Sequence, residues 1–218
     1  MYHTISDINK TIHLQQYIDN KCGTKKIGLK SFTYTIGWYN LVDDYIQKET
    51  DRPSTKGIRL TPGLYSYQQV SKKFQELDIS LTVHETNGIV FLVSPTDLRI
   101  SKGLKTMLGL GNKRRIKANQ TYEGDVPIDF APYKQLYVHL EQINSFNNFF
   151  NGTPSNILDV VPVENKLFGD IVYTYFDNPI YKKLSHGEIS ELSISVCDEN
   201  GQKINNHGLP ISCVLETI

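Results

Sequence analysis

Residues 30–38, KSFTYTIGW, decide the fold class of this chain. Apolar and aromatic side chains occupy every second position, at Phe32, Tyr34, Ile36 and Trp38. Successive side chains of a β-strand point to opposite faces, whereas a helix needs apolar residues three and four positions apart. The segment therefore predicts a strand with one buried face.

The same period of two recurs along the chain. It predicts further strands at 58–60, 79–83, 89–93, 135–143, 157–163, 170–176, 189–196 and 211–215. Turn pairs such as Asn87-Gly88 and Asn200-Gly201 separate many of these strands. Because parallel strands would need connections of a dozen or more residues, such short connections favour antiparallel pairing. The sequence thus predicts an all-β fold, an antiparallel two-sheet β-sandwich.

Two local features add detail to this sandwich. Ser66 is a suitable N-cap, and Val70, Phe74 and Leu77 have helical spacing, which predicts one short helix at 66–77. The strands at 189–196 and 211–215 are joined by a loop centred on Asn205, so they are expected to form a closing hairpin on one sheet.

Residues 1–27 have a weaker pattern than the rest of the chain. Ile5, Ile8 and Ile12 have helical spacing, but polar residues dilute it. The segment is predicted to be an N-terminal arm, flexible or ordered on a partner. No repeat or linker interrupts the remainder, so residues 28–218 are expected to form a single domain.

Composition excludes several classes of protein. The 218 residues include 23 Lys and Arg and 23 Asp and Glu, so no whole-molecule field attracts nucleic acid or an anionic membrane. A local basic cluster at Lys113, Arg114, Arg115 and Lys117 is expected to be a solvated loop. No 18 apolar residues run together, so no membrane span is expected. Asp7 and Lys10 interrupt the apolar run that a signal peptide would need, so the protein is expected to be made inside the cell.

The sequence lacks the residue patterns that indicate an enzyme. The sequence contains no GxSxG, GxxxxGK[ST], HExxH or HxH pattern, and Cys22, Cys197 and Cys213 form no CxxC pair. Neighbouring carboxylates such as Asp43 and Asp44 give no reason to expect a shared cleft. We therefore predict no catalytic residue, no cofactor and no metal.

Three phenylalanines in a polar loop, SFNNFFNG, are candidates for an interface: Phe146, Phe149 and Phe150. Exposed phenylalanine is unfavourable in water, and buried aromatic anchors dominate protein interfaces. The alternative is that this loop folds onto its own sandwich.

Several segments in their order along the chain resemble one protein family. They are IGLKSFTYTIGWYNL (27–41), IRLTPGLYSYQQV (58–70), LKTMLGLG (104–111), NPIYKKL (178–184), ISELSISVCDENGQKI (189–204) and PISCVLETI (210–218). Together they resemble the minor capsid, or penton, proteins of Polinton/Maverick elements and adintoviruses. The resemblance implies a single jelly roll that forms a homopentamer at the vertices of a virion capsid, beside a major capsid protein with a double jelly roll.

Two other functions remain open at this stage. One is a monomeric β-sandwich binding module, lectin-like or receptor-binding, with its site in loops such as 146–154 or 112–125. The other is a jelly-roll enzyme, which metal analysis would reveal. The oligomeric state of the protein separates the capsid function from the monomeric module.

Overall fold

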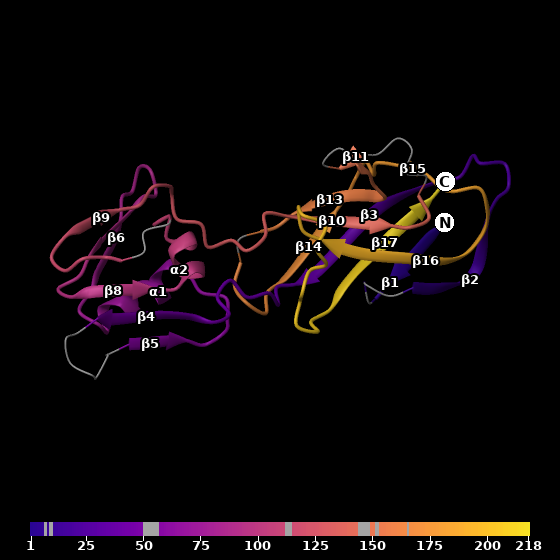
Figure 1. Cartoon of the computed structure of the whole chain (residues 1–218). Helices are drawn as coiled ribbons and strands as arrows, with labels where there is room; N and C mark the ends of the chain where they lie inside the picture. Colours follow the sequence, from indigo (N-terminus) through magenta and orange to yellow (C-terminus); the bar gives the residue numbers. More distant parts are fainter. Residues whose placement is uncertain are drawn as a thin grey trace. The chain divides into compact units, whose positions relative to one another are not determined.

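The computed structural model describes residues 1–6, 8, 11–49, 57–111, 115–143, 149–150, 153–164 and 166–218. The chain divides into two compact units (Figure 1). Unit 1 combines Met1–Trp38 with Tyr133–Ile218, and unit 2 is Tyr39–Pro132. The sequence predicted one domain over 28–218; the structure instead places unit 2 as an insertion within unit 1.

Within the described residues, the strands of unit 1 form two main antiparallel sheets. The first has the order β1-β17-β3-β14, with β15 also paired to β3, and the second has the order β13-β10-β16-β2. Their bounds are β1 (Tyr2–Ile5), β2 (Thr11–Asn20), β3 (Lys26–Thr35), β10 (Gln135–Leu140), β13 (Ile157–Pro162), β14 (Ile171–Tyr175), β15 (Lys182–Lys183), β16 (Gly187–Cys197) and β17 (Ile211–Thr217). A small ribbon, β11 (Phe149–Phe150) with β12 (Thr153–Pro154), pairs separately.

The pairing of these strands identifies the fold of unit 1 as a jelly roll. Leaving aside the two-residue strands, the described part of the unit has eight strands. The first pairs with the last (β1 with β17), the second with the seventh (β2 with β16), the third with the sixth (β3 with β14) and the fourth with the fifth (β10 with β13). Successive strand pairs therefore alternate between the two sheets, which is the winding of a single jelly roll. This confirms the all-β, antiparallel sandwich predicted from sequence.

The segment that predicted the fold supplies the core of unit 1. Phe32 and Tyr34 of β3 are fully buried, and the rings of Tyr34 and Trp38 stack with centroids 5.6 Å apart. Tyr34 also accepts a hydrogen bond from the backbone N–H of Glu164 at 3.1 Å, so its one polar atom keeps a partner. The alternation at 30–38 is thus the inward face of a central strand.

Two predictions for unit 1 are corrected by the topology. Residues 1–27, predicted as an arm, contribute β1 and β2, and β2 pairs with β16 along Thr11–Asn20. The last two strands form no hairpin, because β16 pairs with β10 and β2 whereas β17 pairs with β3 and β1. Cys197 and Cys213 therefore lie on different sheets as free thiols, and burial raises the pKa of Cys213 to about 12.

In the residues that the structure describes, unit 2 has two small antiparallel sheets, β5-β4-β8 and β6-β7-β9, together with two helices. Their bounds are β4 (Asp44–Glu49), β5 (Gly57–Leu60), α1 (Tyr67–Gln75), β6 (Ser80–Val83), β7 (Val90–Val93), β8 (Asp97–Ile100), α2 (Lys102–Met107) and β9 (Thr121–Glu123). The predicted helix is confirmed as α1, with Ser66 and Gln69 forming a capping box. Phe74, Leu104 and Leu110 belong to a hydrophobic core made of unit 2 residues alone.

Candidate interaction surface

The predicted phenylalanine site lies largely outside what the structure describes. Phe146 is outside the described residues. Phe149 and Phe150 form β11, whose backbone pairs with Thr153–Pro154, but their side chains are not described. The interface prediction for these three residues therefore stays a prediction.

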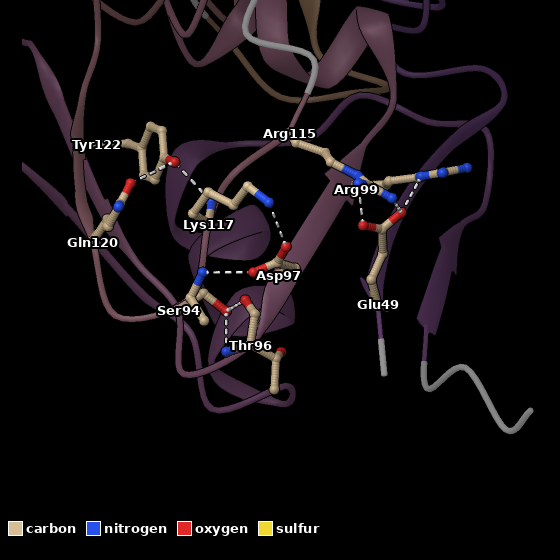
Figure 2. Close-up of polar contacts among 10 residues, drawn as sticks. Glu49, Ser94, Thr96, Asp97, Arg99, Arg115, Lys117, Gln120 and Tyr122 are labelled. Carbon is tan, nitrogen blue, oxygen red and sulfur yellow. Dashed lines mark hydrogen bonds and ion pairs between the residues drawn. The ribbon is translucent and has the colours of Figure 1, made fainter. Parts of the chain in front are cut away.

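The basic cluster of unit 2 is occupied by ion pairs where it is described. Figure 2 shows Glu49 of β4 between Arg99 and Arg115, with the Arg115 Nε 2.8 Å from a Glu49 carboxylate oxygen. Lys117 lies 3.3 Å from Asp97. Glu49 and Asp97 thus offset part of the positive charge of Arg99, Arg115 and Lys117. Lys113 and Arg114 lie outside the described residues.

Asp97 has a second function in the same network (Figure 2). Its carboxylate accepts a hydrogen bond from the backbone N–H of Ala118 at 2.8 Å. This bond, assisted by Lys117, lowers the pKa of Asp97 below the usual aspartate value. The Lys117 backbone N–H in turn donates to the Tyr122 hydroxyl at 2.7 Å. The network fixes the segment between β8 and β9, which is a structural role.

Among the described residues, no group of three or more His, Cys, Asp or Glu side chains is placed to hold a metal ion. No helix in the described part of the chain is long and apolar enough to cross a membrane.

The most conspicuous exposed surface lies at β14, the outermost strand of the first sheet. Val172 faces the core, while Ile171, Tyr173 and Tyr175 point outward and are 67%, 61% and 51% exposed. Large exposed side chains continue into the segments on either side of the strand. We call this surface the β14 strip, which comprises Leu167, Phe168, Ile171, Tyr173, Tyr175 and Ile180.

The charged groups beside the β14 strip are engaged with tyrosines. The Glu216 carboxylate on β17 accepts a hydrogen bond from the Tyr181 hydroxyl at 2.6 Å. Hydrogen bonds from Tyr181 and Tyr2 lower the pKa of Glu216, and the same carboxylate raises the pKa of both tyrosines. The Lys30 ammonium lies 4.9 Å from the ring centroid of Tyr175, within cation–π distance. This outer face is consequently aromatic, with a paired carboxylate and a lysine held against a ring.

A groove opens at the other edge of the sandwich, between β1 and β2. β1 ends the first sheet and β2 ends the second. In β2, Ile18 pairs with Ile189 and His13 with Glu191, so residues 14–17 bulge opposite Ser190 alone. We call the resulting cavity of about 500 Å³ the β1–β2 groove, lined by Met1–Ile5, Ile12–Gln16 and Leu192.

Sequence reasoning missed both surfaces. For β14, the missed signal was that the outward Ile171, Tyr173 and Tyr175 are large aliphatic or aromatic residues and not small polar or charged ones. A strand with one solvated face should show polar residues there. For the groove, the bulge in β2 breaks the period of two, which is why residues 11–20 were not predicted as a strand.

Comparisons with known proteins include a match to a solved structure. No family model matches the chain, and no curated protein matches it. Among solved structures, it is similar to the selenomethionine-labelled penton protein of mavirus, with a TM-score of 0.49 and 8% sequence identity. The alignment covers 100% of this chain and 99% of that chain. At this identity and score the likeness assigns no function.

Proposed function

We propose that the chain is a structural protein of a virus or virus-like transposon, which forms homopentamers at the vertices of an icosahedral capsid. The observation that carries the proposal is the complete jelly-roll winding of unit 1. Jelly rolls are a recurrent architecture of capsid subunits. The order of the motifs from residue 27 to residue 218, which resembles the penton family, agrees with this function.

The exposed surface of unit 1 also supports assembly. Large exposed apolar side chains gathered on a folded domain are characteristic of protein interfaces, and the β14 strip has six of them on one strand and the segments flanking it. In the proposed capsid, neighbouring faces consist of a major capsid protein with a double jelly roll. The protein itself needs no catalytic group, cofactor, membrane span or specific nucleic-acid site for this function.

The test is the mass of the purified full-length protein in solution. Sedimentation equilibrium over a hundred-fold range of concentration should show a species of five times the 24.9 kDa chain mass. A chain that remains at 24.9 kDa throughout would instead favour the binding module, because lectin-like domains share the jelly roll.

A second experiment tests the capsid function separately from the pentamer. The chain is produced together with a double jelly-roll major capsid protein. We expect closed shells that contain both proteins, seen by electron microscopy and by co-sedimentation. Shells that form with the same composition whether or not this chain is present would contradict the proposal.

A further inference from the structure

We infer that the β14 strip of one copy docks into the β1–β2 groove of the next copy. This contact would repeat around the ring, so the inference rests on the proposed homopentamer. It names the two surfaces that meet, which the proposed function leaves open.

The β14 strip has the size and composition of one half of an interface. Its six side chains are between 48% and 70% exposed, and at about 200 Å² for each full side chain they present on the order of 700 Å². A typical monomer exposes apolar patches of about 300–600 Å². A standard interface buries about 800 Å² on each partner. The strip therefore approaches the area that a stable contact requires.

The β1–β2 groove is a suitable counterpart because its polar lining complements the hydroxyl groups of the strip. Gln15 and Gln16 line the groove and are exposed, while Ile5 and Leu192 of its lining are buried. The exposed amide groups offer hydrogen-bond partners to the tyrosine hydroxyls of the strip.

The positions of the two surfaces fit a ring and not a two-fold dimer. β14 and β1 are the two end strands of the same sheet, so the strip and the groove are different patches carried by different end strands. A closed ring needs a heterologous contact, in which two different patches of each copy meet. Unit 1 presents two such patches.

The occupant of the groove is inferred to be a second copy because nothing in the charge of the chain opposes self-association. Acidic and basic residues are equal at 23 each, so two copies do not repel one another as whole molecules. The strip itself carries no ionised side chain, and the core of homo-oligomer interfaces is depleted in charge.

The first test places a charge on the strip. Ile171→Lys and Tyr173→Lys each put an ammonium group at an exposed position, so folding should be unchanged. Val42→Lys is the matched control, because Val42 in unit 2 is 65% exposed against 67% for Ile171. Sedimentation should show subunit affinity at least about 30-fold weaker for the strip variants, the effect of losing a hot spot. The control should assemble like wild type.

The second test uses complementation between two disabled copies. Leu14→Lys is the variant that disables the groove. If the melting temperature of Leu14→Lys is lower than that of wild type, Gln16→Lys is used in its place. Each single variant should be a monomer. Mixing the groove variant with Ile171→Lys restores one intact strip and one intact groove, so a dimer of the two variants should form and go no further.

The outcomes separate this inference from the proposed function. If wild type assembles but the strip and groove variants assemble equally well, only this inference fails. The same holds if both variants are monomers and their mixture stays monomeric, because the contact is then not heterologous. A wild-type chain that remains a monomer overturns both.

Discussion

At the scale of single residues, two neighbouring aspartates have opposite environments. Asp43 is exposed and paired with Arg59, whereas Asp44 is buried. The Asp44 carboxylate accepts hydrogen bonds from the Ser101 hydroxyl at 2.5 Å and from the Leu104 backbone N–H at 3.0 Å. It thereby joins β4 to the beginning of α2. Sequence adjacency alone showed no difference between the two carboxylates.

Asp44→Ala should destabilise the protein because it leaves these buried donors without an acceptor. The expected loss is about 2–3 kcal/mol in the free energy of unfolding. Asp43→Ala is the matched control and should cost less than about 1 kcal/mol, since its ion pair is exposed. Denaturant unfolding followed by circular dichroism measures both. Equal losses for the two variants would contradict the assigned role of Asp44.

Asp97 predicts a pH dependence of stability. Its pKa in the folded protein is lower than the usual 3.8. A carboxylate with a lowered pKa contributes its full stabilisation at pH values above its pKa in the unfolded chain. This contribution is lost as the pH falls through its pKa in the folded protein. The difference in melting temperature between wild type and Asp97→Asn should thus be largest at pH 6–7 and shrink below about pH 4. A difference that is constant with pH would show that the charge of Asp97 is not involved.

At the scale of elements, the loop between β16 and β17 carries the chain from one sheet to the other. Asn206 holds this loop against the end of β3. Its amide group donates to the Thr35 carbonyl at 2.9 Å and to the Leu209 carbonyl at 3.0 Å. Its side-chain oxygen accepts from the Gly37 backbone N–H at 2.8 Å. Asn206 is buried, and its bonds to Thr35 and Gly37 are buried as well.

Asn206→Ala should therefore lower the free energy of unfolding by about 2–4 kcal/mol, because several buried polar groups lose their partners. Asn205→Ala is the control, since Asn205 is exposed and its side chain bonds only locally, to the His207 backbone N–H. Its effect should stay below about 1 kcal/mol. If Asn206→Ala proves as mild as the control, the loop is held by other contacts.

Strands were predictable from sequence where the period of two is uninterrupted, in central strands such as β3 and also in the edge strands β13 and β14. β3, β16 and β17 alternate clearly because each has a neighbour on both sides and one dry face. β2 was missed because exposed polar residues and a bulge at 14–17 interrupt its alternation. The sheet change between β16 and β17 was also missed, since a turn-rich loop of the same composition serves a hairpin equally well.

At the scale of the whole molecule, the insertion of unit 2 left no mark in the composition. Strand spacing near ten residues continues across both units, and no glycine- or proline-rich linker separates them. The chain leaves unit 1 after Trp38 and returns at Tyr133, and the rings of these two residues lie edge to face with centroids 5.4 Å apart. Both connections therefore lie side by side in unit 1, as expected for a domain inserted into a host fold.

This geometry predicts that unit 1 folds without unit 2. Replacing Tyr39–Pro132 by a short glycine-serine linker should leave the jelly roll intact, because the linker has only to join two neighbouring residues. Trp38 is the only tryptophan of the chain and is 2% exposed. The shortened protein should thus keep the blue-shifted tryptophan emission and the cooperative thermal transition of a folded domain.

The same shortened protein also tests where assembly resides. The β14 strip and the β1–β2 groove both belong to unit 1. The oligomeric state measured by sedimentation should consequently match that of the full chain, and Ile171→Lys should disrupt it in the same way. Red-shifted emission would show that the jelly roll depends on the insertion for folding. A folded but strictly monomeric product, obtained while the full chain assembles, would place essential subunit contacts in residues 39–132.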